Sequence, residues 1–508
     1  MMLVRGRALV GRRECRISKA AWLALLLLLM LSAAWLCLVF SAKRCCFHRL
    51  QLAEDVQELL LSPPIRLNWP RDDEMEDATF KAAIASAWTE GNVGSMNLSV
   101  HNIVFGVAGT VSFWPNRKEL IKLWWKPPRM RGFVWLEESV PYEKDLPLVM
   151  VSEDTSRFSY TNAFGRPTGI RIARIILETF KLRIPDVNWF VLCDDDTIFS
   201  VENLVRVLNK YDSSQLYYIG STSESHGQNL AFNFNMAYGG GGFAISYALA
   251  EALVKMLDNC LERYPELFGS DDRIHACISE LGVPLTREPG FHQCDIMGNA
   301  MGLLAAHPVA PFVSLHHVEV MEPLLPGHTL QESLRLLTKA MRTEPGSFLQ
   351  QSICYDQEQS LSYSVSTGYV VQVYPEILYP SRLERVEVTF RAWNERNGLN
   401  EFDQDTRESK GICRQPYLFY IEGMQYQKRS GSVISNYKRD LLVDHHKRYC
   451  WSRLFSLDKV QRIRVQSEPL TMNWYKVPRR QCCKVASLRD GVLNLRIQAC
   501  QPGEIIAL

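Results

Sequence analysis

The segment from Trp189 to Asp196, which reads Trp-Phe-Val-Leu-Cys-Asp-Asp-Asp, constrains the possible fold of this chain more than any other. Its apolar residues suit a strand that is buried on both faces of a parallel sheet. Ligands of an open α/β sheet bind at the carboxyl ends of the strands, so the three acids are expected where a substrate would bind. Adjacent carboxylates repel one another unless a cation or hydrogen-bond donors offset their charge, and a divalent metal that carries a pyrophosphate is a natural partner. The alternative is an exposed acidic turn after a strand.

The N-terminus predicts a membrane anchor. Ala20 to Ala42 is an uncharged, Leu-rich stretch of 23 residues, which exceeds the ~20 residues that cross a bilayer. More basic residues precede this stretch than follow it, which predicts a cytoplasmic N-terminus and a lumenal remainder. We therefore expect a cytoplasmic tail at 1–19, a single-pass type II signal anchor at 20–42 and a stem at 43–96, with a cleaved signal peptide as the alternative.

Composition restricts the partners and the compartment. The formal net charge is +2 and no long basic run occurs outside the N-terminal tail, which argues against nucleic acid as the main partner. Ten of the 14 cysteines lie beyond Phe47, and an even number in an oxidising lumen is compatible with several disulfides. Cys193 is expected to be buried in its strand and free. Asn97-Leu98-Ser99 is an N-glycosylation acceptor triplet.

Two regions with different patterns follow the stem. From 97 to 326 strands and helices alternate, which predicts an α/β fold with a mainly parallel sheet covered by helices on both faces. Helices are expected at Arg117–Trp125, Thr168–Lys181, Val201–Tyr211, Tyr247–Tyr264 and Asp272–Glu280, and strands at Asn102–Ala108, Phe133–Leu136, Leu148–Val151 and Tyr217–Gly220 besides the acidic one. From 327 to 508 short β-branched and aromatic segments predict a mostly β region, with strands at Gly368–Tyr374, Val386–Trp393, Tyr417–Ile421 and Val460–Val465.

Three further motifs accompany the acids. Tyr238-Gly-Gly-Gly-Gly-Phe243 allows a close approach of the backbone to a ligand, although a tight crossing of two backbones would also explain it. Asp271 and Asp272 begin a helix, where one acid caps the helix and a second is available as a general base. His316 and His317 follow an apolar stretch, and an imidazole beside carboxylates is a plausible ligand set for Mn²⁺.

In this order, the motifs resemble those of the Fringe-like branch of inverting nucleotide-sugar glycosyltransferases. The resemblance covers Ile103 to Glu319 and is closest to the plant Fringe-related group, whose C-terminal region ends in an Arg-Arg-x-Cys-Cys segment, as at Arg479–Cys483 here. It implies a GT-A-like nucleotide-sugar-binding sheet flanked by helices. The first strand departs from the Fringe pattern at Gly106–Thr110, which leaves the donor sugar open.

The resemblance also implies roles for individual residues. Asp194 and Asp196 would hold Mn²⁺ against the donor diphosphate together with His316, for which His317 is the reserve. Asp272 would be the catalytic base, with Asp271 as the reserve. The donor-binding residues that it implies are Asp195, Arg117, Gly239, Gly240, Gly241 and Gly242, with Gly241 in place of the alanine of the family.

The function implied is that of a Golgi-type, membrane-anchored, inverting glycosyltransferase. It would move a sugar from a UDP-sugar donor to a glycan or glycoside acceptor in a Mn²⁺-dependent single displacement. A non-catalytic lectin-like or scaffolding lumenal protein that retains the transferase fold is one alternative. A metal-dependent phosphohydrolase is another, but it would need more metal ligands after later strands.

Overall fold

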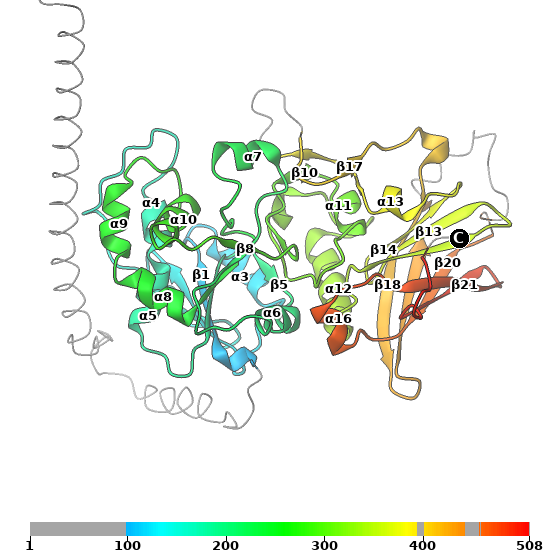
Figure 1. Cartoon of the computed structure of the whole chain (residues 1–508), viewed down its shortest axis with the longest axis horizontal. Coiled ribbons are helices and arrows are strands. Elements are labelled where there is room, and N and C mark those ends of the chain that lie inside the picture. The colour runs from blue at the N-terminus through cyan, green and yellow to red at the C-terminus, as the bar shows by residue number, and fades with distance from the viewer. Residues whose placement is uncertain (1–97, 394–400, 442–456, 458, 507–508) are drawn as a thin grey trace, which may run out of the picture. The chain divides into compact units, whose positions relative to one another are not determined.

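A computed structural model describes residues 98–393, 401–441, 457 and 459–506 (Figure 1). The expected tail at 1–19, anchor at 20–42, stem at 43–96 and the acceptor Asn97 lie outside these residues. Among the residues that are described, no helix is both long and apolar enough to cross a bilayer. All of the described residues fall within one compact unit.

The first part of this unit is built on a seven-stranded sheet with the order β3-β2-β1-β4-β7-β6-β8. The strands are β1 (Ile103–Ala108), β2 (Arg131–Leu136), β3 (Leu148–Val151), β4 (Trp189–Asp194), β6 (Tyr218–Gly220), β7 (Phe243–Ser246) and β8 (Leu285–Arg287). Strand β1 runs parallel to β2 and β4, β2 to β3, and β6 to β8, whereas β7 is antiparallel to both β4 and β6. The sheet is therefore mixed. Strand β7 was not predicted from the sequence, because it has only four residues and lies directly between the glycine run and helix α8 (Tyr247–Val254).

Both faces of the sheet are buried by helices (Figure 1). Side chains alternate along β1, so that Ile103, Phe105 and Val107 join one hydrophobic cluster and Val104 and Ala108 join another. The first cluster includes α3 (Trp114–Ile121), α6 (Val201–Leu208) and α11 (Met301–Ala305); the second includes α4 (Thr168–Ala173), α5 (Ile175–Lys181), α8 (Tyr247–Val254), α9 (Leu257–Arg263) and α10 (Asp271–Glu280). This two-sided burial explains why the strands read as continuous apolar runs.

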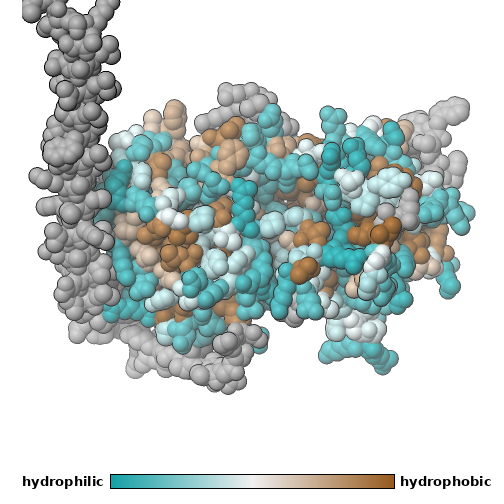
Figure 2. Space-filling model, viewed as in Figure 1, coloured by the Kyte–Doolittle hydropathy of each residue, from teal (hydrophilic) through white to brown (hydrophobic). Residues whose placement is uncertain are grey.

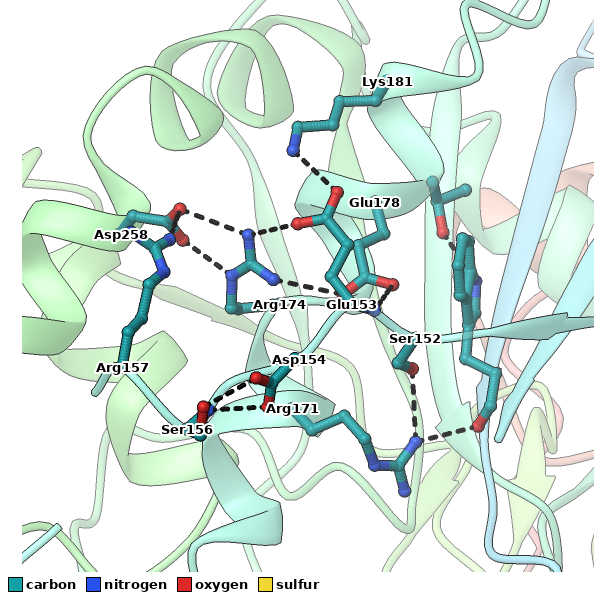
Figure 3. Close-up of polar contacts among 12 residues, drawn as sticks. Ser152, Glu153, Asp154, Ser156, Arg157, Arg171, Arg174, Glu178, Lys181 and Asp258 are labelled. Carbon is teal, nitrogen blue, oxygen red and sulfur yellow. Dashed lines mark hydrogen bonds and ion pairs between the residues drawn. The ribbon is translucent and has the colours of Figure 1, made fainter. Parts of the chain in front are cut away.

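Two expected long helices are each divided in two. The segment 168–181 forms α4 and α5, which meet at Arg174, and the segment 247–264 forms α8 and α9, which meet at Lys255 and Met256. Arg174 is 1% exposed, and its guanidinium lies among Asp258, Glu153 and Glu178 (Figure 3). A buried charge of this kind must be paired, so the junction is fixed by ion pairs that hydrophobic periodicity does not reveal.

The second part is a closed eight-stranded barrel with the order β12-β13-β14-β18-β19-β20-β22-β21. Its strands are β12 (Gln351–Asp356), β13 (Leu361–Ser366), β14 (Val370–Tyr374), β18 (Tyr417–Gln427), β19 (Ser432–Arg439), β20 (Arg462–Ser467), β21 (Cys482–Arg489) and β22 (Val492–Gln498). The disulfide Cys354–Cys483 joins β21 to β12, and Cys482–Cys500 joins β21 to the segment after β22. A third disulfide, Cys260–Cys277, joins α9 to α10. Cys193 is buried and free, as the sequence predicts.

The two parts share secondary structure and a core. Strand β10 (Ile296–Gly298) pairs antiparallel with β16 (Phe390–Ala392) from the C-terminal region. The hydrophobic cluster on the α3 face of the sheet continues through α12 (Leu330–Thr343) into the barrel. On the face drawn in Figure 2, hydrophobic residues form separate areas among hydrophilic ones. Most of the large apolar side chains of the described residues are buried.

Candidate active site

The three acids occupy the carboxyl end of the central strand β4. Asp194 is the last residue of β4 and is in register with Ala108 at the end of β1. Asp195 and Asp196 follow in the turn, and each is only 1% exposed. An exposed acidic turn is therefore excluded for these two residues, and their charges must be compensated within the protein or by a ligand.

A small second sheet brings His316 to the acids. Strand β5 (Ile198–Phe199) begins two residues after Asp196, and β11 (Ser314–Leu315) ends one residue before His316. These strands pair antiparallel, with Ser314 opposite Phe199 and Leu315 opposite Ile198. Strand β9 (Phe291–His292) pairs parallel with the other edge of β11. The pairing of β5 with β11 therefore places the acids and the histidine, which lie far apart in sequence, next to each other.

Asp194, Asp196 and His316 form a group suited to a metal. Their ligand atoms all lie within 4.8 Å of one another. Nε2 of His316 is 3.1 Å from Oδ1 of Asp196 and 3.8 Å from Oδ2 of Asp194. Nδ1 of His316 donates to the carbonyl oxygen of Gln293 at 3.0 Å, which directs Nε2 toward the acids, as is usual for metal-binding histidines. Oδ2 of Asp195 is buried without a hydrogen bond, and Oδ1 of Asp196 faces Nε2 of His316, so a divalent cation with a preference for oxygen and imidazole ligands fits this group.

Charged neighbours set the ionisation of the acids. Arg117 contacts Asp195 at 2.7 Å, Asp196 at 3.0 Å and Glu319 at 3.2 Å. Burial raises the pKa of Asp195 to about 6 although Arg117 opposes it. Burial also raises the pKa of Asp196, but His316 and Arg117 outweigh burial and hold that pKa below its usual value. Arg117, which lies on α3, thus offsets the negative charge of Asp195 and Asp196. Its role in binding the donor stays a prediction.

The glycine run lies against the other site residues. A Cβ atom at Gly240 would lie 2.1 Å from Cε1 of His316, and one at Gly239 would lie 2.5 Å from Oδ1 of Asp271. The backbone nitrogen of Gly241 donates to Oε1 of Gln293 at 2.6 Å. Gly242 has φ +79°, in the left-handed region where glycine is favoured. The absence of side chains therefore lets the loop before β7 pack directly on His316 and Asp271.

The two acids at the start of α10 have different surroundings. Asp271 lines a small pocket with Asp194 and Gly239 and accepts from the backbone nitrogen of Gly239 at 2.8 Å. Partial burial raises the pKa of Asp271 to about 6. Asp272 instead accepts from the backbone nitrogens of Phe268 at 2.6 Å and Gly269 at 2.9 Å. The geometry therefore favours Asp271, the reserve candidate, over Asp272 as the base.

Several residues that hold the site together were not predicted from the sequence. Gln293 contacts both His316 and Gly241, and Glu319 contacts Arg117. Trp393 stacks on His317, which lies 3.2 Å from Asp295. His317 therefore faces Asp295 and Trp393, not the group of Asp194, Asp196 and His316. No local motif marks these residues, because their contacts are with residues far away in the sequence.

Two family models match overlapping parts of the chain. The model of the Fringe-like family matches residues 98–322. The model of a protein family of unknown function, DUF604, matches residues 228–483, half of the chain. The chain belongs to the DUF604 family and carries a Fringe-like domain. The expected resemblance to Fringe-like proteins is confirmed.

Two curated relatives share part of the chain. The β-1,3-glucosyltransferase of Mus musculus is 31% identical over 140 residues, 27% of this chain and 27% of the relative. That of Homo sapiens is 35% identical over 120 residues, 23% of each chain. The chain thus spans about a quarter of the length of the curated relatives that it matches.

Proposed function

We propose that this protein is an inverting glycosyltransferase that moves a sugar from a UDP-sugar to a glycan or glycoside acceptor. The observation that carries the proposal is the convergence of Asp194, Asp196 and His316 at the carboxyl end of β4, with Asp271 lining the adjacent pocket. The names of the two curated relatives support a glucosyl donor, so UDP-glucose is the first donor to test. The uncharged stretch at 20–42 and its basic flank support a type II anchor in the Golgi membrane.

The residues of this chain support a single displacement. Asp271 removes the proton from an acceptor hydroxyl while that oxygen attacks the anomeric carbon of the donor. The bond from this carbon to the diphosphate oxygen breaks on the opposite face, so that UDP leaves and the configuration inverts. Asp194, Asp196 and His316 would hold Mn²⁺, which when bound supplies positive charge against the departing diphosphate. Arg117 keeps the acids oriented through its contacts with Asp195 and Asp196.

One observation weighs against a phosphohydrolase. Besides Asp194, Asp196 and His316, the described part of the chain contains one other group of three potential ligands, Cys482, Cys500 and Glu504. Its two cysteines are joined in a disulfide. A second metal centre therefore has no ligand set in the region that the structure describes.

Thermal unfolding of the purified full chain with UDP tests the proposal. UDP with Mn²⁺ at 100 times its dissociation constant is expected to stabilise the protein by about 2.7 kcal/mol, and Asp196→Asn is expected to remove this effect. Asp145→Asn, at an exposed acid, is the matched control and should respond as the wild type does. If UDP with Mn²⁺ stabilises neither the wild type nor the control, the transferase proposal fails and a lectin-like or scaffolding role takes its place.

A further inference from the structure

The loop that follows β9 turns sharply at Cys294. This residue is buried and has φ +55°, in the left-handed region that residues other than glycine rarely adopt. Such a conformation is unfavourable in itself and persists only where the surrounding structure fixes it, which happens most often at functional sites. The contacts around Cys294 must therefore stabilise the turn.

The turn directs the residues on either side of Cys294 toward two successive histidines. Strands β9 and β11 pair in parallel, so the segments that follow them lie side by side. Before the turn, the carbonyl oxygen of Gln293 accepts from Nδ1 of His316 at 3.0 Å. After it, Oδ1 of Asp295 lies 3.2 Å from Nδ1 of His317. The orientation of His316 therefore depends on where this turn places the carbonyl group of Gln293.

Glu224, from the segment after β6, stabilises the turn with both of its carboxylate oxygens. Oε2 accepts from the backbone nitrogen of Cys294 at 2.7 Å, and Oε1 lies 3.1 Å from Nδ1 of His292 at the end of β9. Glu224 is only 8% exposed. A buried carboxylate is a costly way to satisfy a single backbone nitrogen, whereas here it joins the strand end to the turn.

The backbone around Glu224 is itself fixed by the C-terminal region. The carbonyl oxygen of Glu224 accepts from the backbone nitrogen of Asp403 at 3.1 Å. The next residue, Ser225, forms an antiparallel bridge with Phe402. The carboxylate of Glu224 is therefore carried by a segment with its own backbone pairing, and this segment supports the turn at Cys294.

We propose that Glu224 is a positioning residue of the metal site: it holds the turn at Cys294 and, through it, the carbonyl oxygen of Gln293 against His316. The inference rests on the proposed function, because it concerns the metal that His316 would hold together with two of the acids. Glu224 acts indirectly, since its side chain contacts the loop and not the group of metal ligands. Its effect on metal affinity should therefore depend on the length of the side chain and not on its charge.

Two substitutions of Glu224 in the full chain separate length from charge. Glu224→Asp keeps a carboxylate but is one methylene shorter, so it no longer reaches both partners. Glu224→Gln keeps the length and an oxygen acceptor for the backbone nitrogen of Cys294, and its amide nitrogen can donate to Nδ1 of His292 in the other tautomer.

The measured quantity is the Mn²⁺ concentration that gives half of the full thermal shift at a fixed UDP concentration. Each variant is compared with its own metal-free state, so that a general loss of stability does not enter. Glu224→Asp is expected to raise this concentration about tenfold, the low end of the usual effect of a group behind a metal ligand. Glu224→Gln is expected to stay close to the wild type.

Glu387→Asp is the matched control, because Glu387 is 3% exposed and its carboxylate contacts Arg407 and Ser409. It should lower the melting temperature and leave the Mn²⁺ requirement unchanged. An unchanged requirement in Glu224→Asp, or an equal rise in Glu387→Asp, would overturn the role of Glu224.

Two further outcomes have a clear meaning. A raised Mn²⁺ requirement in Glu224→Gln with none in Glu224→Asp would also overturn the positioning role, since that pattern follows the charge. Wild-type protein without any Mn²⁺-dependent shift by UDP would instead overturn the proposed function itself.

Discussion

Trp393 stacks on His317 with 4.4 Å between ring centroids and 11° between ring planes. The ring of His317 in turn lies 3.8 Å from that of His316. Trp393 follows β16 and lies beyond the Fringe-like match, which ends at residue 322. A side chain of the C-terminal region thus supports, through His317, the histidine that we propose as a metal ligand.

Replacement of this indole should loosen His316 without removing a ligand. Trp393→Ala is expected to weaken the apparent affinity for Mn²⁺ about two- to tenfold, the effect of losing one aromatic pair. Titration of the UDP-dependent thermal shift with Mn²⁺ measures this affinity. Trp393→Phe retains a ring and should recover most of it, and equal affinities in all three proteins would show that the stack has no bearing on the metal.

Asp271 and Asp272 can be separated by substitution. Asp271→Asn is expected to lower transfer about 10²- to 10⁴-fold, the usual contribution of a general base, and to keep the thermal shift by UDP and Mn²⁺. Asp272→Asn is expected to retain transfer but to lower the free energy of unfolding by about 1–2 kcal/mol, because the backbone nitrogens of Phe268 and Gly269 lose a charged acceptor. Transfer rates and urea unfolding measure the two effects, and the reverse pattern would assign the base to Asp272.

The pH dependence of transfer should report the base. Partial burial raises the pKa of Asp271 to about 6, and only its ionised form accepts a proton. We therefore expect kcat/KM to fall below about pH 6 as Asp271 becomes protonated and to be level just above it. A profile measured at saturating Mn²⁺ checks this limb; a limb near pH 4 would indicate an unperturbed carboxylate.

Gly240 should tolerate no side chain. A Cβ atom there would lie 2.1 Å from Cε1 of His316, so Gly240→Ala is expected to displace the imidazole and abolish the Mn²⁺-dependent shift. Gly241→Ala is the control, because its Cβ atom would come no closer than 3.1 Å to any atom, the nearest being backbone of Gln293 and His292, and the resemblance to the Fringe-like family implies alanine at this position. Equal loss in both variants would mean that the loop, and not His316, is disturbed.

Glu178 predicts a loss of stability with rising pH. Burial raises the pKa of Glu178 to about 7 against opposition from Arg174, so between pH 4.5 and 7 the unfolded chain releases a proton that the folded chain keeps. The free energy of unfolding therefore falls over this range, by up to about 3 kcal/mol. Glu178→Gln should lack this fall, so its stability relative to wild type should increase from pH 5 to 7.5 and then level off.

A neighbouring acid provides the control for this prediction. Glu153 pairs with Arg174 and Lys181 (Figure 3), and these hydrogen bonds outweigh burial and lower its pKa. Its contribution to stability is complete above the pKa of the unfolded chain and is lost only at lower pH. The difference between Glu153→Gln and wild type should accordingly be flat from pH 5 to 7.5, and a similar slope in both variants would contradict the assignment to Glu178.

The sequence predicted the elements that are determined by local pattern. The apolar run before Asp194, the alternation of strands and helices, and the β-rich C-terminal region all follow from periodicity, which burial on two faces imposes directly. Closure of the barrel was not predicted, because the pairing of β12 with β21 joins residues far apart in sequence. The same holds for the pairing of β5 with β11, which brings His316 to the acids.

The site itself was predictable in its residue types but not in its details. The acids, the glycines and the late histidines stand out from their residue types, the resemblance implies their roles, and the structure brings Asp194, Asp196 and His316 together. The choice between Asp271 and Asp272 depends on the helix start, where successive side chains point about 100° apart. Periodicity does not fix a helix start to one residue, so the backbone contacts of each acid were needed to distinguish them.

The pairing of β10 with β16 joins the Fringe-like part and the C-terminal region through backbone hydrogen bonds, so neither part retains all of its strand pairs without the other. A chain shortened after the Fringe-like match would expose the edge of β10 and would lack Trp393, which stacks on His317. The connection between β14 and β18, which carries β16 and Trp393, therefore covers β10 and supports His317 from outside the barrel, so a change in this connection reaches the candidate site directly.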